Sequence, residues 1–250
     1  MDGLFDRDLI NRYDTIIGID EAGRGPLAGP VVAAAVFLDP ADSRTLNGKT
    51  VEDQIMDDLP FLDDSKKLSR KKRETVFDFI QETSISFGIG LASQADIDRC
   101  NILNATAMAM QRAVEQLNIP FSMAIVDGKS LKLAFPNIQT VKGDSKSIRI
   151  SLASNIAKVY RDRLLIKAGE RFREYGFERH KGYGTKEHRE AIKRNGPLPF
   201  HRLTFSPVSE SIDERLLEEW HNEDIIDDIR MMRILEKRKQ LNEVNNNARL

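Results

Sequence analysis

Short apolar runs recur along the first 140 residues, and their pattern predicts strands. Thr15–Asp20 is a short run that ends in acids, Pro30–Leu38 is a longer one, and Ser84–Ala92 alternates between apolar and polar positions. Two further runs follow at Met123–Val126 and Asn137–Val141. We expect each run to form one strand of a sheet, because each is short and bounded by turn-forming residues.

Elsewhere apolar residues recur every three or four positions, which predicts helices. Ser93 and Asp96 form a capping-box pattern at the start of one helix, and Gly196 with Pro197 ends another. The predicted helices cover Ser69–Glu82, Gln94–Leu117, Ile148–Phe172 and Lys186–Arg194. Three strands, a helix and then two more strands indicate a mixed α/β sheet rather than regularly alternating βαβ units.

Two segments differ from this pattern. The polar stretch Asp39–Asp64 predicts a long loop with room for one helical turn. After Pro207, apolar residues recur at helical spacing among many charges, and we expect Asn245–Leu250 to be frayed. We therefore divide the chain into a main domain, residues 1–206, and a helical C-terminal extension, residues 207–250, which we expect to pack at an edge.

The composition is that of an ordinary globular protein. With 250 residues, 40% of them apolar and 31% charged, the chain can bury a sizeable core and is not largely disordered. The single cysteine, Cys100, excludes a disulfide within the chain and a zinc site of several cysteines, and it suits a reducing cytoplasm. The longest apolar run, Val31–Leu38, is too short to cross a membrane, so we expect a cytoplasmic protein with no membrane partner.

The net charge of −1 conceals an uneven distribution of charge. Residues 1–128 carry 13 Lys and Arg against 21 Asp and Glu, residues 129–206 carry 18 against 7, and residues 207–250 carry 7 against 11. The basic middle segment is compatible with an ordinary solvated surface, but it also fits a surface that faces a polyanion such as nucleic acid. Nucleic acid would repel the acidic extension, so we expect the extension to lie away from the active cleft.

Four acidic residues stand where strands end or loops begin. Asp20 and Glu21 end the first apolar run and precede a Gly-Arg-Gly turn. Alone they also fit a plain acidic turn, whereas a phosphate-cradling glycine loop does not fit because its spacing differs. Asp127 ends a later strand before Gly128, which is a common position for a site and also for a turn. Asp144 lies among lysines, where an ion pair or a helix N-cap is an equal alternative.

Together these carboxylates, with no histidine or cysteine partner, are the hard oxygen ligands that suit Mg²⁺ or Mn²⁺ rather than zinc. A divalent cation would relieve the repulsion between acids that share one pocket. Two such ions about 4 Å apart support hydrolysis of a phosphodiester, in which one activates water and the other stabilises the leaving oxygen. His180, His188 and His201 are few and scattered, and we assign none of them to metal binding.

Several separate motifs follow one another along the chain. They read DEAGRGPLAGPVVAAAV (20–36), DDSKKLS (63–69), VDG (126–128), KGDSKS (142–147), SLASNIAKVYRDR (151–163), HKGYGTKEH (180–188) and HRLTFSPV (201–208). In this order they resemble the type 2 ribonucleases H in their bacterial single-chain form, ribonuclease HII. The resemblance runs over about residues 15–208. The Asp39–Asp64 loop and the tail after Pro207 look longer than is usual in the family, but neither touches a catalytic motif.

The resemblance implies a ribonuclease H-like fold, in which a mixed five-stranded sheet is flanked by helices and followed by a helical C-terminal region. It implies endonucleolytic cleavage of the RNA strand of RNA–DNA hybrids, which leaves a 3′-hydroxyl and a 5′-phosphate. It also implies incision on the 5′ side of single ribonucleotides embedded in duplex DNA, and thus removal of misincorporated ribonucleotides and RNA primers. We expect a monomer that acts on these hybrids and duplexes.

The resemblance also implies roles for individual residues. The family's four metal-binding acids correspond to Asp20, Glu21, Asp127 and Asp144. The turn that senses the ribose 2′-hydroxyl corresponds to Gly23, Arg24 and Gly25. The recognition tyrosine corresponds to Tyr183, whose ring would stack on the neighbouring deoxyribose; a ring packed in a glycine turn is the plainer alternative.

The remaining assignments concern charged side chains. The candidate phosphate contacts are four lysines, each equally well explained as a solvated surface charge: Lys66, Lys67, Lys146 and Lys181. Asp162 lies in a family motif, but we expect it to form an ion pair on the long helix, outside the metal site. Two other functions stay open at this point. One is a hybrid-binding module without catalysis, which the complete set of acids disfavours. The other is a related hybrid-cleaving enzyme that ignores single ribonucleotides, which Tyr183 and the Gly-Arg-Gly turn disfavour.

Overall fold

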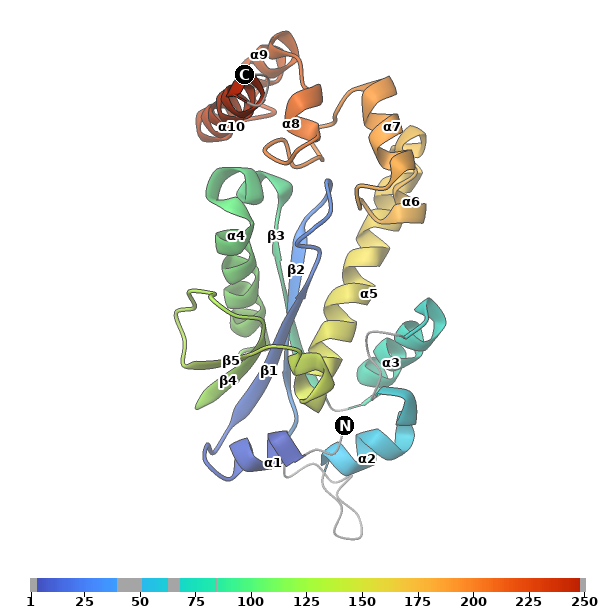
Figure 1. Ribbon diagram of the computed structural model, residues 1–250. Coiled ribbons are helices and arrows are strands. Elements are labelled where there is room, and N and C mark those ends of the chain that lie inside the picture. Colours follow the sequence, from blue (N-terminus) through green and yellow to red (C-terminus); the bar gives the residue numbers. More distant parts are fainter. Residues whose placement is uncertain (1–3, 40–50, 63–67, 84, 248–250) are drawn as a thin grey trace. The chain divides into compact units, whose positions relative to one another are not determined.

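The computed structural model describes residues 4–39, 51–62, 68–83 and 85–247 (Figure 1). The chain forms two compact units. The first, here called the sheet unit, consists of Met1–Gly23, Val31–Leu91 and Thr106–Arg161. The second, the helical unit, consists of Arg24–Pro30, Ala92–Ala105 and Asp162–Leu250. Two long helices, α4 (Gln94–Leu117) and α5 (Ile148–Arg171), each contribute to both units.

A five-stranded mixed sheet is the main element of the sheet unit, as predicted. Its strands lie in the order β3-β2-β1-β4-β5. β1 runs antiparallel to β2 and parallel to β4, and β4 runs parallel to β5. The strands are β1 (Ile16–Ala22), β2 (Val31–Phe37), β3 (Ser86–Ala92), β4 (Met123–Asp127) and β5 (Asn137–Thr140).

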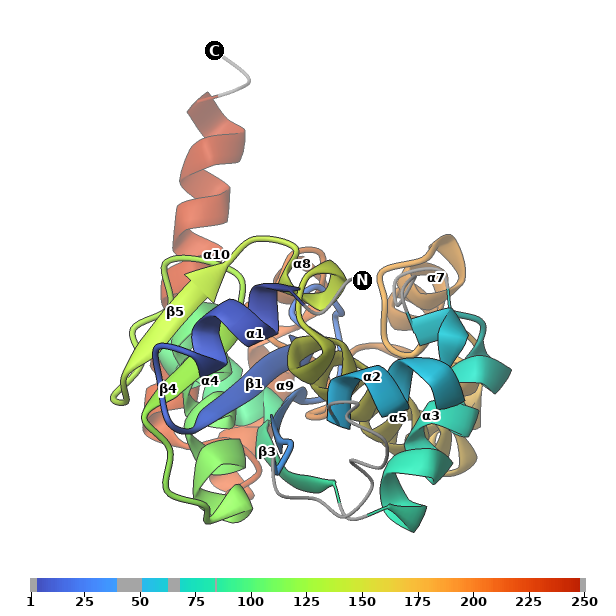
Figure 2. The same cartoon turned by 90° about the horizontal axis from the view of Figure 1, so that it is seen from below.

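Helices flank this sheet (Figure 2). Besides parts of α4 and α5 they are α1 (Leu4–Ile10), α2 (Val51–Asp58) and α3 (Arg70–Glu82). The sequence pattern did not predict α1, whose Leu9 packs with Ile16, Ile125 and Ile150 in one buried cluster. The four helices that the pattern did predict are present, with ends that differ by only a residue or two.

Where the structure describes the segment Asp39–Asp64, it is more helical than the predicted loop with one helical turn. Residues 51–58 form the two-turn helix α2, and residues 40–50 and 63–64 lie outside the described part. Val51 and Ile55 are buried, so α2 is held by packing. These two apolar positions are too few to form a clear helical pattern in a stretch that is rich in polar residues.

A buried ion cluster joins three distant parts of the sheet unit. Arg149, at the start of α5, is 1% exposed. Its guanidinium lies 2.5 Å from Glu52 of α2 and 3.4 Å from Asp6 of α1. Asp6 also accepts the backbone N–H of Ile148. Burial raises the pKa of Asp6, and the charge of Arg149 opposes that rise. The arginine therefore stabilises two buried carboxylates together.

The helical unit contains one apolar core that the C-terminal segment helps to form. Leu217, Trp220 and Ile234 pack in the same buried cluster as Leu165 and Phe177. Its elements are η4 (Arg173–Tyr175), α6 (Phe177–His180), α7 (Lys186–Asn195), α8 (Val208–Ser211), α9 (Glu214–Asn222) and α10 (Asp228–Asn247). The C-terminal region is helical, as predicted. The boundary between 206 and 207 stays a prediction, although side chains from both sides of it share this core. We expected Asn245–Leu250 to be frayed. The helix α10 continues to Asn247, and residues 248–250 lie outside the described part.

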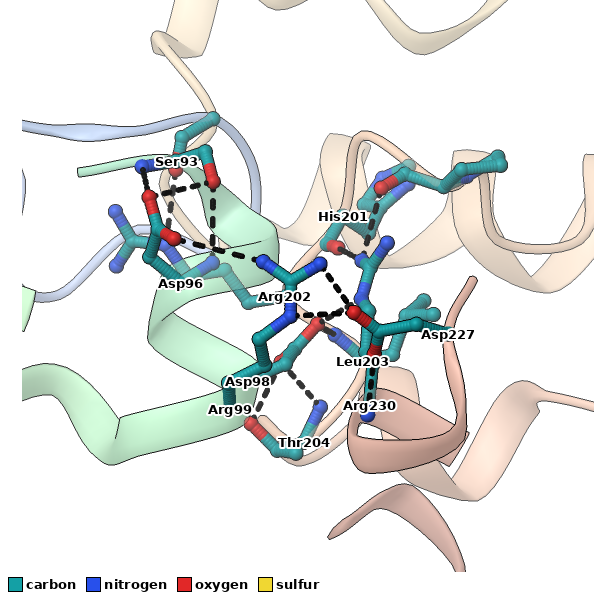
Figure 3. Close-up of polar contacts among 12 residues, drawn as sticks. Ser93, Asp96, Asp98, Arg99, His201, Arg202, Leu203, Thr204, Asp227 and Arg230 are labelled. Atoms are coloured by element: carbon teal, nitrogen blue, oxygen red, sulfur yellow. Dashed lines mark hydrogen bonds and ion pairs between the residues drawn. The ribbon is translucent and has the colours of Figure 1, made fainter. Parts of the chain in front are cut away.

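A buried aspartate ties the loop after residue 198 to two helices of this unit (Figure 3). Asp98 of α4 accepts the backbone N–H groups of Leu203 and Thr204, at 3.1 and 2.9 Å. It also pairs with Arg230 of α10 at 2.9 Å, and Arg230 donates to the carbonyl of His201. The predicted capping box at the start of α4 is confirmed. Residues 201–204 are therefore fixed by charged groups rather than by regular secondary structure.

The three histidines that are scattered in the sequence lie together in the helical unit. The rings of His180 and His188 stack with their centroids 4.4 Å apart, and Nε2 of His188 lies 3.1 Å from Nε2 of His201. Burial lowers the pKa of His188 to about 4 and that of His201 to about 3. Both rings are therefore neutral near pH 7.

The buried ion cluster generates a prediction about stability. Arg149→Met should lower the free energy of unfolding by about 3–5 kcal/mol, because it leaves Asp6 and Glu52 buried without their cation. The matched control is Arg7→Met, which removes a half-exposed pair with Asp53 and should cost less than about 1 kcal/mol. Urea unfolding of both variants measures the difference. Equal losses would show that the buried cluster has no special role.

The histidine cluster generates a prediction about pH. Unfolded histidine has a pKa of about 6.5, so below that pH the unfolded chain binds protons that folded His188 and His201 do not bind. The free energy of unfolding should therefore fall between pH 7 and pH 5, by on the order of 3 kcal/mol for the pair. The raised pKa values of Asp6 and Asp20 act in the opposite direction.

The comparison is therefore made with the double variant His188→Asn, His201→Asn, in which only the histidine contribution is absent. Its loss of stability between the two pH values should be smaller than that of the unaltered chain by that amount. An identical pH dependence of the two proteins would contradict the assignment of depressed pKa values to this pair.

Candidate active site

The register of β1 and β4 places two of the predicted acids next to each other. The strands run parallel, and Ile19 pairs with Val126 near the end of both. Asp20 and Asp127 are the next residue on each strand, so they occupy neighbouring positions at the same end of the sheet. Asp20 is 6% exposed and Asp127 is half-buried. The pairing of the strands, rather than the sequence separation, brings these carboxylates together.

The electrostatics of Asp20 reflect this crowding. Burial raises its pKa well above the usual range, and the negative charges of Glu21 and Asp127 raise it further. Two hydrogen bonds oppose the rise, one from the side chain of Ser154 on α5 and one from the backbone N–H of Glu21 at 2.7 Å. Asp20, Glu21 and Asp127 therefore interact as one group of acids.

Asp144 reaches the same region through the short helix η3 (Gly143–Ser145). The backbone N–H of Gly143 donates to Oδ1 of Asp127 at 2.7 Å. Asp144, the next residue, is 3% exposed, so the protein encloses its carboxylate although lysines surround it in the sequence. The hydrogen bond ties the segment that carries Asp144 to the carboxylate at the end of β4.

The donor set fits a hard divalent cation in its chemistry. All four groups are carboxylates, and the repulsion that raises the pKa of Asp20 is what a bound cation would relieve. Among the residues that the structure describes, no three histidine, cysteine or acidic side chains are already arranged to hold a metal ion. The chemistry of the ligands, rather than a preformed arrangement, is therefore what suits a divalent cation here.

Within the Gly-Arg-Gly segment the chain passes from the sheet unit to the helical unit. Gly23 ends a segment of the sheet unit and has φ +97°, and a Cβ at this position would lie 2.0 Å from Nε of the buried Arg161. Only glycine therefore fits there. Arg24 and Gly25 belong to the helical unit. Gly25 is exposed, and a Cβ at Gly25 would have no atom within 4 Å, so its backbone is open to a ligand.

Tyr183 lies in a tight turn of the helical unit and is 42% exposed. Part of the residue is therefore at the surface, and its role in recognition stays a prediction. Gly182 has φ +80°, and a Cβ there would lie 2.8 Å from the carbonyl oxygen of Ala28. The backbone N–H of Leu27 donates to the Gly182 carbonyl at 2.7 Å. The Tyr183 turn is therefore bonded to the segment that follows Arg24 and Gly25.

Arg202 organises this segment, and it is not among the residues that the sequence pattern predicts to be functional. It is fully buried and donates to the carbonyls of Arg24 at 2.8 Å and Gly29 at 3.1 Å. Its own backbone N–H donates to Leu27 at 2.8 Å. The motif HRLTFSPV, which contains Arg202, could have pointed to this residue. The charge count instead includes Arg202 among the cations that face a polyanion.

The lysines differ in their surroundings. Lys66 and Lys67 lie outside the described residues. Lys146 is exposed and donates to Oγ1 of Thr140 at 3.3 Å, within the segment that carries Asp144. Lys181 is half-buried and donates to the carbonyl of Glu178.

Of the helices in the described part of the chain, none combines the length and the apolar character that a membrane span requires.

Comparison with known proteins confirms the resemblance that the motifs indicated. Residues 17–208 match the family model described as Ribonuclease HII. The ribonuclease HII of Thermotoga maritima is 45% identical over 223 residues, which cover 89% of this chain and 86% of that protein. The ribonuclease HII of Syntrophotalea carbinolica is 49% identical over 199 residues, which cover 79% of this chain and 88% of that protein.

Solved structures agree with the fold. The ribonuclease H2 of Pyrococcus horikoshii has a TM-score of 0.62 and 25% identity, and the match covers 78% of this chain and 96% of that one. A ribonuclease HIII solved in complex with Mn²⁺ has a TM-score of 0.56 and 17% identity, over 79% of this chain and 68% of that one, and shows the fold alone. This chain therefore belongs to the ribonuclease HII family and is an endoribonuclease that degrades the RNA of RNA–DNA hybrids with the help of a divalent metal ion.

Proposed function

We propose that this enzyme also incises duplex DNA on the 5′ side of single embedded ribonucleotides, leaving a 3′-hydroxyl and a 5′-phosphate. In the cell it would remove misincorporated ribonucleotides and RNA primers. We further propose that it works as a monomer in the cytoplasm, where a protein with one cysteine is stable without disulfides. The observation that carries the proposal is the group of crowded carboxylates at the ends of β1 and β4.

In this proposal the four carboxylates of Asp20, Glu21, Asp127 and Asp144 hold Mg²⁺ or Mn²⁺. When bound, such ions activate water and stabilise the charge on the leaving 3′-oxygen. The chain's own contribution is to hold the acids in place. Ser154 and the Glu21 backbone orient Asp20, and the Gly143 N–H orients Asp127. Carboxylate oxygens suit both Mg²⁺ and Mn²⁺, so both ions are to be tested.

Recognition of the ribonucleotide is proposed to lie with the Gly-Arg-Gly turn and Tyr183. The 2′-hydroxyl is the group that distinguishes a ribonucleotide from its deoxy neighbours. The exposed backbone at Gly25 can approach it closely, because no side chain fills that space. The exposed ring of Tyr183 can stack on the deoxyribose that follows. Lys146 and Lys181, together with Lys66 and Lys67, would contact phosphates.

Removal of one carboxylate tests the proposed metal site. Asp127→Asn should lower the rate of cleavage at least about 100-fold, since loss of a group that stabilises transition-state charge costs on the order of 10²–10³ in rate. Binding to a hybrid should change little, because asparagine keeps an oxygen for the Gly143 N–H. The measurement is cleavage of a duplex with one ribonucleotide, in Mg²⁺ and in Mn²⁺. The control is Asp228→Asn, at an exposed residue, which should cleave at the unaltered rate. A wild-type rate for Asp127→Asn would refute the assignment of Asp127 to the metal site.

Removal of the Tyr183 ring tests its proposed role in recognition. Tyr183→Ala should lower kcat/KM for single-ribonucleotide incision about tenfold or more, in line with the roughly 1–3 kcal/mol that aromatic stacking contributes. Cleavage of a long RNA–DNA hybrid should fall less. Tyr183→Phe keeps the ring and should behave like the unaltered enzyme. Equal loss on both substrates would instead favour an enzyme that cleaves hybrids and ignores single ribonucleotides.

A further inference from the structure

A continuous chain of hydrogen bonds leads through two buried histidines to the turn that carries Tyr183. The backbone N–H of Leu198 donates to Nδ1 of His201 at 2.9 Å. Nε2 of His201 lies 3.1 Å from Nε2 of His188, and Nδ1 of His188 lies 2.9 Å from the carbonyl oxygen of Tyr183. His188 and His201 are both fully buried.

The two ends of this chain fix the proton positions within it. A backbone N–H can only donate, so Nδ1 of His201 accepts and the proton of this neutral ring is on Nε2. That proton points at His188, whose Nε2 must then accept. The proton of His188 is consequently on Nδ1, where it donates to the Tyr183 carbonyl, which can only accept. One arrangement of protons satisfies all three contacts.

The third histidine binds the same turn. Nδ1 of His180 accepts the N–H of Gly182 at 3.2 Å, and its Nε2 donates to the carbonyl of Tyr175 at 2.8 Å. The turn is also joined to the segment after Arg24, because Leu27 donates to Gly182. Ala28 in that segment forms a β-bridge with His201 itself. His201 thus lies between the two elements that the proposed function assigns to ribonucleotide recognition.

We propose that His188 and His201 are positioning residues that hold the Tyr183 turn in place for recognition of a ribonucleotide joined to DNA. The proposal rests on the proposed function, in which Tyr183 contacts the substrate. The two histidines touch no substrate; they act through the Tyr183 carbonyl. A ring that stacks on one particular sugar has to be held closely, because a shift of its turn moves the whole side chain.

The chain works only while both rings are neutral. A proton added to His188 would place its Nε2–H against the Nε2–H of His201, and a proton added to His201 would place its Nδ1–H against the Leu198 N–H. The other titratable groups that face the pair are His180, which stacks on His188, Glu187 on α7, and Tyr175, whose ring lies 5.2 Å from that of His201. The positive charge of a protonated His180 would oppose protonation of the pair, whereas Glu187 would favour it.

The experiment compares two substitutions of His188 that are similar in polarity. His188→Asn places an amide donor where Nδ1 is now, so it keeps the bond to the Tyr183 carbonyl. His188→Gln places its amide where Nε2 is now, so it loses that bond. The readout is the ratio of kcat/KM for a duplex with one ribonucleotide to kcat/KM for a long RNA–DNA hybrid. We expect this ratio to fall about threefold to tenfold for His188→Gln, the range that loss of one hydrogen bond gives, and to stay within about twofold for His188→Asn.

Combination with a Tyr183 variant separates positioning from a general loss of structure. In a Tyr183→Ala background, His188→Gln should cause no further fall in the ratio, because the group that it positions is gone. His221→Gln, the same substitution at a partly exposed histidine paired with Asp228, should leave the ratio unchanged. Thermal unfolding of every variant identifies the temperature at which all of them are folded, and the ratios are compared there.

The outcomes distinguish this proposal from the one on which it rests. If Tyr183→Ala leaves the ratio unchanged, the proposed function of Tyr183 is wrong. If Tyr183→Ala lowers the ratio but His188→Asn and His188→Gln give equal ratios, Tyr183 has its role and the positioning proposal is overturned. If the loss from His188→Gln persists in full in the Tyr183→Ala background, the histidine acts on something other than Tyr183, and the proposal is likewise overturned.

Discussion

Two carboxylates stand side by side in the sheet unit because β1 and β4 run parallel in a fixed register. The residues after the paired Ile19 and Val126 are both aspartates, and one of them is almost fully buried. Such an arrangement is unfavourable in the absence of a cation, because burial and mutual repulsion both disfavour the charged forms. The paired residues of β1 and β4 are almost all apolar and buried, so apolar packing imposes the crowding on which the proposed chemistry depends.

In the helical unit, side chains hold segments of irregular backbone in place. The segment Arg24–Pro30 and the Tyr183 turn are neither helix nor regular strand, so their backbone groups need other partners. Arg202 donates to carbonyls of the segment Arg24–Pro30. His188 binds the carbonyl of Tyr183 in the turn. Asp98 and Arg230 then fix the backbone that carries Arg202. Buried polar groups here replace the regular hydrogen bonding that strands and helices provide.

The sequence predicted the strands and the longer helices well because their apolar spacing is set by burial. It did not predict α1 and α2, which contribute few apolar residues and are stabilised in part by Arg149. The partners of Arg149 lie 97 and 143 residues away along the chain, and no local pattern can indicate such contacts. The sequence could single out the four acids as candidate metal ligands from their places at strand ends and in loops, whereas the strand register shows why Asp20 and Asp127 are neighbours.

The buried charges also change how the basic segment is interpreted. Residues 129–206 contain 18 Lys and Arg, but Arg149, Arg161 and Arg202 are fully buried and serve the protein's own structure. A charge count on the sequence treats these arginines as surface that faces a polyanion, which overstates the attraction for nucleic acid. Arg202, for example, binds the carbonyls of Arg24 and Gly29. Under the proposed function a fixed position matters there, because detection of one 2′-hydroxyl in a duplex would rely on few contacts. Each contact is effective only if its position is fixed before the substrate binds.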